Sequence, residues 1–439
     1  MRRALVAVLI GVLAVAVWLA PAPEPVTVEL PVTTATAGPV VASNFSNCAW
    51  AIADDTRETL MSIVTLSDVE VQLTFPVAGE IRETYPESLP GPGASAIPLS
   101  TILSLGVSPA VVEFSDSPAA AGVIAEGEGS LAGDLCPSSA SKVWVLPGGT
   151  TVQDRPLDLQ LFNPFPEDAL VTVEAISEEG FEPVPDLERV SIPGRSWRTL
   201  ALGDVLPFRQ RLSVTVRTEQ GRIIPAMVQT NGTDQAIWTD VGRSEVWEFP
   251  LVAVGELQPF LAIANAGPLE VTYTLDVFTA DGPVESAVEG LVPAEGHDRI
   301  SVAGLADGAY AVRLRADGPV SAVVVGEGEG QVAATSGAPL TARQWMLPGA
   351  GANSSAQSSL WFLNTGADSI TVTYQLLDAG GTVDLPSKVA LPAGTVRRVP
   401  LDQIGVSGVI AESTGLFSAA WSAETELATA YASGIPVGE

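Results

Sequence analysis

The chain has few side chains suited to nucleophilic, acid–base or metal chemistry other than its carboxylates. Among its 439 residues are one histidine, His297, and two cysteines, Cys48 and Cys136. A single imidazole excludes sites that need several histidines, and a histidine-based triad would depend on His297 alone. His297 stands where other copies of a repeat have Trp197 and Val396, and no neighbour identifies a nucleophile for it. We therefore predict a structural surface role for His297 and no enzymatic activity.

The two cysteines bracket one sequence unit, because Cys48 precedes Trp50 and Cys136 precedes Trp144. The N-terminus indicates export to an oxidising compartment, where disulfides form and persist. We therefore predict a Cys48–Cys136 disulfide rather than two buried thiols, with a contribution to stability of roughly 4–5 kcal/mol. With both thiols bridged and one histidine present, the composition argues against a zinc site.

Calcium is the one cofactor that the composition leaves open, because oxygen ligands are plentiful among 51 acidic residues. The candidate segments are Asp54-Asp55, Asp307-Gly308, Glu126-Gly127-Glu128-Gly129 and Glu327-Gly328-Glu329-Gly330. None has EF-hand spacing, and Asp-Gly is primarily a turn signal. We interpret the Glu-Gly-Glu-Gly copies as acidic loops at strand ends and predict no cofactor. No pair of carboxylates stands out for glycosidase chemistry, which needs a shaped cleft.

Tryptophan recurs in register at Trp144, Trp247 and Trp345, with a degenerate copy at Trp50, so these residues are predicted core or junction residues. Four other tryptophans have no repeated counterpart: Trp361, Trp197, Trp238 and Trp421. Trp361 lies between Leu360 and Phe362, and strand alternation places it on the opposite face from them. These four are the candidate contacts for a ligand or partner, by stacking on a sugar or packing on a protein. The alternative, which we favour, is that they cover a neighbouring domain.

The recurring tryptophans define four units of about a hundred residues each: 44–140, 141–243, 244–341 and 342–439 (repeats 1 to 4). In repeats 2 to 4 a strand ends at Asn163, Asn265 or Asn364, where the side chain can bond a following turn. A second, β-branched strand and a Pro-centred turn follow, and two closing strands are predicted to form a hairpin. In repeat 3 that hairpin turns at Ala316-Asp317-Gly318.

About seven short strands in each unit, without helical periodicity, predict an all-β chain of tandem immunoglobulin-like β-sandwiches. We expect the four sandwiches to form an extended row. The alternative is a β-propeller in which each unit holds two blades, but no half-unit repeat is evident.

The N-terminus carries an export signal. Arg2 and Arg3 precede an uncharged run over residues 4–20, which is at the lower limit for a membrane span. We assign 1–23 to an uncleaved signal-anchor, or alternatively to a cleaved signal peptide, and 24–43 to a linker. The protein is therefore predicted to be extracytoplasmic, held in the inner membrane by an N-terminal helix or secreted. The net charge of −30 argues against nucleic acid as a partner.

The Trp-x-Leu-Pro copies at Trp144 and Trp345 and the strands ending at Asn163, Asn265 and Asn364 resemble an actinobacterial envelope family, domain of unknown function family 5719. The resemblance covers about residue 44 to the end. It implies an extracytoplasmic location and no known activity.

We predict a non-catalytic structural or interaction protein of the bacterial cell envelope, with an envelope protein or wall glycan as partner. The alternative is a carbohydrate-binding protein of the wall that uses outward aromatic residues, and a glycan-acting enzyme is a distant third.

Overall fold

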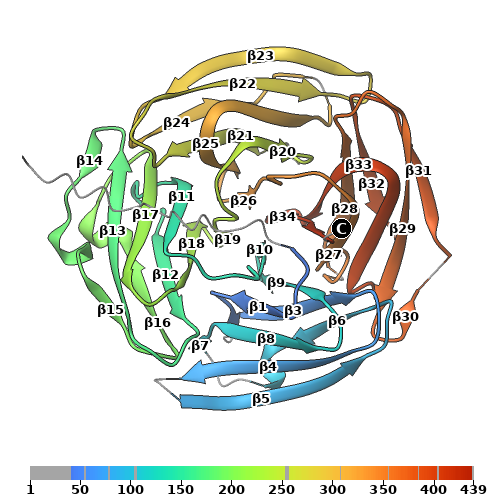
Figure 1. The fold of residues 1–439 in the computed structure, drawn as a ribbon, viewed down its shortest axis with the longest axis horizontal. Helices are drawn as coiled ribbons and strands as arrows, with labels where there is room; N and C mark the ends of the chain where they lie inside the picture. The colour runs from blue at the N-terminus through green and yellow to red at the C-terminus, as the bar shows by residue number, and fades with distance from the viewer. Residues whose placement is uncertain are drawn as a thin grey trace, which may run out of the picture. The chain divides into compact units, whose positions relative to one another are not determined.

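β-branched and apolar residues at period two form strands throughout the part of the chain that the computed structural model describes. Described are residues 41–53, 56–77, 80–102, 106–252, 257–306, 308–353, 355–383, 385–402 and 405–437. The predicted signal-anchor (1–23) and most of the predicted linker (24–43) lie outside these ranges. The strands pair within four groups along the chain, each with two main sheets, which share one long strand in the third and fourth groups (Figure 1).

The first sheet of each repeat contains the strand that carries, or precedes, the recurrent tryptophan. Repeat 1 has β1 (Phe45–Cys48), β8 (Ala110–Ser115), β4 (Val69–Val77) and β5 (Glu80–Leu89); repeat 2 has β11 (Val143–Gly149), β17 (Leu212–Gln220), β13 (Ala169–Ser177), β14 (Gly180–Glu182) and β15 (Val190–Ile192). Repeat 3 has β20 (Ser244–Phe249), β25 (Ala311–Glu327), β22 (Val271–Phe278) and β23 (Pro283–Val292). Repeat 4 has β27 (Ala342–Pro348), β33 (Gly408–Glu424), β29 (Ile370–Asp378), β30 (Gly381–Thr382), β31 (Ser387–Leu391) and β35 (Ile435–Pro436).

In repeats 2 to 4, the second sheet contains the strand that ends at the recurrent asparagine. It consists of β10 (Ser130–Leu135), β9 (Ala119–Gly127), β3 (Arg57–Thr65) and β6 (Gly93–Pro98) in repeat 1, and of β19 (Asp234–Trp238), β18 (Ile224–Asn231), β12 (Leu157–Asn163) and β16 (Ser196–Ala201) in repeat 2. In repeat 3, β25 continues into the second sheet and joins β26 (Val332–Ser336), β21 (Gln258–Asn265) and β24 (Gly296–Ser301). In repeat 4, β33 does so and joins β34 (Thr429–Ser433), β28 (Gln357–Asn364) and β32 (Thr395–Leu401). Short elements are β2 (Ile52–Ala53), β7 (Gly106–Val107), η1 (Leu99–Thr101), η2 (Pro185–Leu187) and α2 (Leu202–Val205).

The two sheets of a repeat differ in how they are buried. Along β13 of a first sheet, buried and partly exposed residues alternate, as expected for a sheet with one face on a core. Along β21 and β28 of second sheets, every residue after the first is buried. The second sheets therefore pack on both faces, one against their own repeat and one against a neighbouring repeat.

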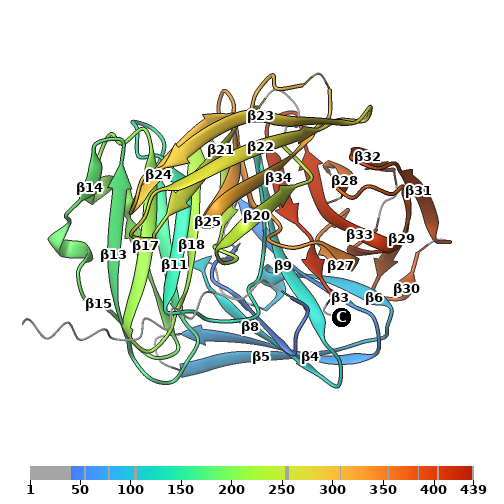
Figure 2. The same cartoon turned by 45° about the horizontal axis from the view of Figure 1, so that its top comes forward.

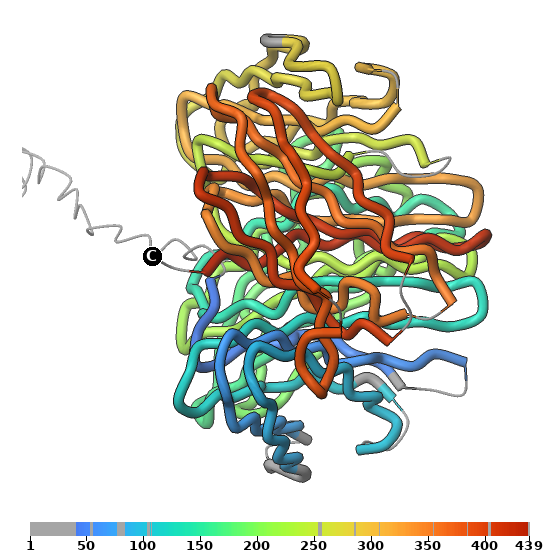
Figure 3. Tube along the Cα trace, turned by 90° about the vertical axis from the view of Figure 1, so that its right-hand side faces the viewer, coloured from blue at the N-terminus to red at the C-terminus, as the bar shows by residue number. Residues whose placement is uncertain are grey.

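The predicted closing hairpins are wrong. The first half of β25 pairs with β20 and β22, whereas its second half pairs with β21 and β26, so the chain crosses from one sheet to the other. Strand β33 does the same in repeat 4, which Figure 3 shows from the side in orange and red. The Asp-Gly signal has another origin: the Asp317 carboxylate accepts the N–H (2.8 Å) and the hydroxyl (2.6 Å) of Thr272 at the start of β22.

The predicted bonding of the recurrent asparagines to their turns is confirmed. Asn265 Oδ1 accepts the N–H of Gly267 (2.9 Å), and its Nδ2 donates to the carbonyls of Leu269 (2.6 Å) and Pro293 (3.0 Å). Asn163 and Asn364 make the same set of bonds in their repeats. Each asparagine thus joins its own turn to the Pro-centred turn about 28 residues later.

We expect Asn265→Ala to lower the free energy of unfolding by about 1–2 kcal/mol, because it removes two partly buried hydrogen bonds to backbone carbonyls and one from a backbone N–H. Urea denaturation of the variant measures this loss. Asn44→Ala is the matched control, since Asn44 is exposed. Equal stability of the two variants would show that the bridge between the two turns contributes nothing.

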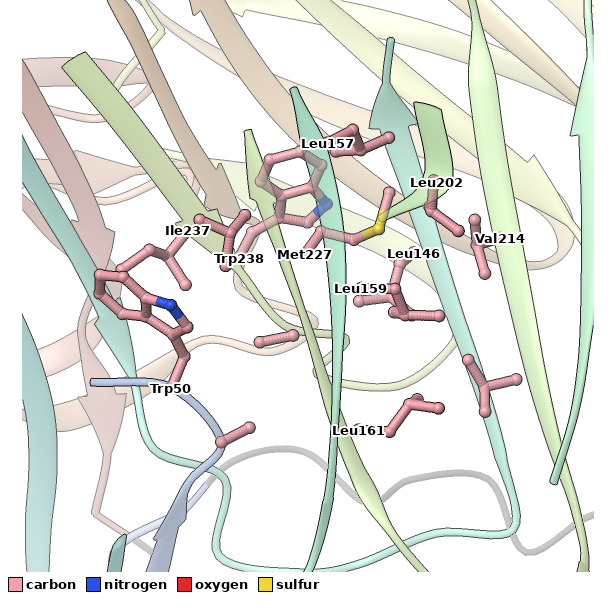
Figure 4. Close-up of a cluster of buried hydrophobic side chains, with 14 of the residues drawn as sticks. Trp50, Leu146, Leu157, Leu159, Leu161, Leu202, Val214, Met227, Ile237 and Trp238 are labelled. Atoms are coloured by element: carbon pink, nitrogen blue, oxygen red, sulfur yellow. The ribbon is translucent and has the colours of Figure 1, made fainter. Parts of the chain in front are cut away.

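The recurrent tryptophans are core residues, as predicted. Trp144, Trp247 and Trp345 are fully buried. The indole N–H of Trp247 donates to Val320 O (2.9 Å) and that of Trp345 to Phe417 O (2.9 Å), so each fixes the crossing between the two sheets of its repeat. Trp50 packs beyond its own repeat, beside Ile237 and Trp238 of repeat 2 (Figure 4).

The expected extended row of repeats is also wrong, because the first repeat contacts the last. The hydroxyl of Ser62 in repeat 1 donates to Ser407 O in repeat 4 (2.7 Å). One strand from each second sheet lies at the centre, namely β10, β19, β26 and β34, and each contacts the next in a closed cycle (Figure 1). The apolar back faces of the second sheets cause this arrangement, since an open row would leave them in water.

One carboxylate joins all four central strands. Asp234, which is fully buried, accepts the backbone N–H groups of Leu131 (2.9 Å), Gln235 (2.9 Å), Val332 (3.0 Å) and Thr429 (3.4 Å). These four donors occupy corresponding positions in the four repeats, each at or next to the start of its central strand. We call Asp234 and these four N–H groups the central carboxylate site.

Burial raises the pKa of Asp234 from 3.8 to about 7, although its four N–H donors favour the charged form. Burial likewise raises the pKa of Asp240 to about 7 and that of Asp134 well above its ordinary value. The folded protein therefore holds protons near pH 5–6 that the unfolded chain releases. The stability that these groups contribute is fully present below about pH 4 and is lost as the pH rises through 7.

We expect the free energy of unfolding to fall between pH 4.5 and pH 8 by roughly 2–4 kcal/mol for each of Asp234 and Asp240. Asp234→Asn should be less stable at both pH values, since an amide has one acceptor oxygen, and should lose less stability on going to pH 8. Urea midpoints at the two pH values measure both effects, with the exposed Asp186→Asn as control. An unchanged pH dependence in Asp234→Asn contradicts the assignment.

Candidate functional site

A groove of about 910 Å³ lies between repeats 2 and 3 and is called here the repeat 2–3 groove. Its floor is the outward face of strands β13 and β17, where Glu174, Ile176, Thr215 and Arg217 lie. Its wall is the Pro-centred turn of repeat 3, residues 293–297, which leads into β24 beside these strands (Figure 2). The groove thus forms because repeat 3 partly covers a sheet face of repeat 2.

His297 lies in this groove rather than on an open surface. His297 is the second residue of β24 and faces repeat 2, where its Nδ1 lies 2.9 Å from the Ser213 hydroxyl. Burial, together with the nearby charge of Arg211, lowers the pKa of His297, so the imidazole is neutral at pH 7. Ser213 is only 3% exposed, so this pair presents no accessible nucleophile to the groove.

Two carboxylates of the groove, Glu174 and Glu178, already have partners, whereas the Glu295 carboxylate is exposed at its wall. Glu174 accepts from Arg217 Nε (2.8 Å), and Glu178 accepts the backbone N–H groups of Gln210 (3.0 Å) and Arg211 (2.9 Å). Burial opposes ionisation of Glu178, but these N–H bonds and the nearby Arg209 lower its pKa overall. A general acid needs a raised pKa, so Glu178 does not suit that role.

Besides the exposed Glu295 carboxylate, two groups of the groove are available to a ligand. The guanidinium of Arg211 has no hydrogen bond or ion pair to the part of the chain that the structure describes, and its backbone is held by Glu178. Phe181, on the short strand β14, is 64% exposed at the rim. Neither residue stood out in the sequence, because each belongs to a hairpin or loop of ordinary turn composition.

The four unrepeated tryptophans lie away from this groove. Trp361, Trp238 and Trp421 are at most 1% exposed, so none offers an open face for stacking, and Trp197 is partly buried against the core of repeat 2. Trp361 faces away from the core of its own repeat, as strand alternation predicted. There it packs with Leu251, Leu257 and Phe278 of repeat 3.

The cysteines form the predicted disulfide, Cys48–Cys136, within the core of repeat 1. The described ranges contain no group of three or more His, Cys, Asp or Glu side chains that could hold a metal ion. Of the calcium candidates, Asp54, Asp55 and Asp307 lie outside the described residues. The two Glu-Gly-Glu-Gly segments lie at strand ends, and Glu327 pairs with Arg155 and Arg299 (3.1 Å each).

A second groove, of about 660 Å³, lies between repeats 3 and 4 and contains Glu248. This buried carboxylate accepts from Arg313 Nη2 (3.1 Å), from Thr365 Oγ1 (2.6 Å) and from Ser418 Oγ (2.7 Å). Both of its oxygens therefore have donors, and two of these donors, Thr365 and Ser418, come from repeat 4 across the junction. Glu248 is therefore a structural residue rather than a free ligand-binding group.

We expect Glu248→Ala to cost about 3–5 kcal/mol of stability, because it leaves Arg313 without its carboxylate at a largely buried site. Thermal and urea unfolding of the variant measure the loss. The exposed pair of Arg189 and Glu219 supplies the control, since Glu219→Ala should change stability by less than about 1 kcal/mol. A mild effect of Glu248→Ala would mean that the junction does not depend on this ion pair.

Comparison with protein families confirms the resemblance seen in the sequence. The model of a family of unknown function, DUF5719, matches residues 115–237 and 250–431. The chain belongs to this family. A search of the curated proteins finds no match. No helix among the described residues is long and apolar enough to span a membrane.

Proposed function

We propose that this protein is a non-catalytic interaction protein of the bacterial cell envelope, which binds an envelope component in the repeat 2–3 groove. The observation that carries the proposal is the composition of that groove. It combines a guanidinium without a partner in the described ranges, an exposed phenyl ring and the exposed Glu295 carboxylate with two bonded carboxylates and a buried serine. Such a surface can recognise a partner, while its buried serine offers no accessible nucleophile and the lowered pKa of Glu178 does not suit a general acid.

The proposed location is extracytoplasmic, with the protein secreted or held in the inner membrane by its N-terminal segment. The disulfide of repeat 1 supports export, because such bonds persist in oxidising compartments. Each repeat is proposed to be an immunoglobulin-like β-sandwich, supported by two sheets packed on a common core. The closed cycle of repeats would hold the groove rigid for a partner.

A wall glycan is the second candidate for the partner, beside an envelope protein. Phe181 favours it, since an exposed aromatic ring in a groove can stack on a sugar. The unrepeated tryptophans do not contribute to this reading, because they are covered.

We expect the purified full-length chain to co-sediment with isolated cell envelopes of the organism that encodes it, without releasing soluble fragments. The double variant Phe181→Ala/Arg211→Met should lose most of this binding. Its control is Phe45→Ala/Lys388→Met, which removes one exposed phenyl ring and one exposed cation far along the chain.

Binding that the groove variant retains in full would place the contact elsewhere. Release of glycan fragments by the wild-type chain would show that the protein is an enzyme.

A further inference from the structure

Among the residues that the structure describes, the Arg211 guanidinium is the cation of the groove that the fold leaves without a partner. Arg217 is paired with Glu174, and Arg209 is paired with Glu182, so both are neutralised within repeat 2. The Arg211 guanidinium has no such partner within the described ranges, and it lies beside His297, which is neutral. A guanidinium presents a fixed fork of N–H donors that matches the two oxygens of a carboxylate.

The other free groups suit a sugar ring. Phe181 offers an apolar face at the rim, and Pro293 and Ala294 add apolar wall. The Glu295 carboxylate and the carbonyls of the turn are acceptors for hydroxyl groups, which a sugar supplies in quantity.

Resting on the proposed function, we infer that the repeat 2–3 groove binds a sugar that carries a carboxylate, with Arg211 holding the carboxylate and Phe181 stacking on the ring. The carboxylate could come from an N-acetylmuramic acid residue or from a uronic acid, and the two share this chemistry. A densely charged polyanion is disfavoured, because the chain itself carries a net charge of −30.

An acidic peptide fits the groove less well. Extended peptides commonly add a strand to a free sheet edge. Here β13 and β17 are paired with each other and β17 also with β11, so their backbone groups are used. The edge strand β14 has only three residues, which is too short for strand addition.

The test is calorimetric titration of the purified full-length chain with two pairs of soluble probes. One pair is an oligosaccharide containing N-acetylmuramic acid and the same oligosaccharide with N-acetylglucosamine in its place. The other pair contains glucuronic acid or glucose at one position. We expect the acidic member of at least one pair to bind at least about 10-fold more tightly than its neutral partner.

Three variants separate the roles of the two residues. Arg211→Met should abolish the preference for the acidic sugar while weak binding of both sugars remains. Phe181→Ala should weaken both members of a pair by a similar factor, and Lys388→Met should bind as the wild type does. Arg211 is exposed and its backbone bonds to Glu178 remain, so the variants are expected to fold.

Equal binding of acidic and neutral sugars, or a preference that survives Arg211→Met, would falsify the inference. So would tighter binding of a Glu-rich peptide than of any sugar. If no sugar binds but the chain still sediments with envelopes through Phe181 and Arg211, this inference fails while the proposed function stands.

Discussion

The arrangement of the four repeats depends on a single buried carboxylate. Asp234 accepts one backbone N–H from the central region of every repeat. Without it, four N–H groups would meet at a buried point with no acceptor, at a cost of about 1–3 kcal/mol each. Around this point the hydrophobic cores of successive repeats are continuous, and buried apolar residues of repeats 1, 2 and 3 form one cluster. The carboxylate therefore fixes the order and register in which the apolar back faces close on one another.

The candidate site is a consequence of this closure. Because repeat 3 is pressed against repeat 2, its Pro-centred turn covers part of the sheet face formed by β13 and β17, and the uncovered part becomes a groove. The same packing buries Ser213 under His297 and leaves Arg211 and Phe181 at the edge. In a row of loosely connected domains, the groove side chains of repeat 2 and those of repeat 3 would be exposed but would not lie next to one another. Binding in the groove is thus coupled to the integrity of the whole cycle.

Much of the local structure could be predicted from the sequence, because it depends on short-range patterns. The asparagine turns, the buried recurrent tryptophans and the disulfide follow from repeated residues or from cysteine count. The crossing strands were missed because Asp317-Gly318 reads as a hairpin turn, whereas Asp317 bonds to Thr272. The closed cycle had a signal: runs such as Leu360-Trp361-Phe362-Leu363 are apolar on both faces, which is typical of strands buried on both sides. No sequence pattern indicated the central carboxylate site or the groove, since the residues that meet Asp234 and those that line the groove come from segments far apart in the chain.

Native-state hydrogen exchange at the backbone amides of Leu131, Gln235, Val332 and Thr429 tests the central role of Asp234 most directly. If the carboxylate joins the four repeats, these amides should be equally protected in the wild type, with the free energy of global unfolding. All four should lose protection together in Asp234→Ala. Four different levels of protection in the wild type, or a loss confined to Gln235 in the variant, would contradict the account and show that the repeats open independently.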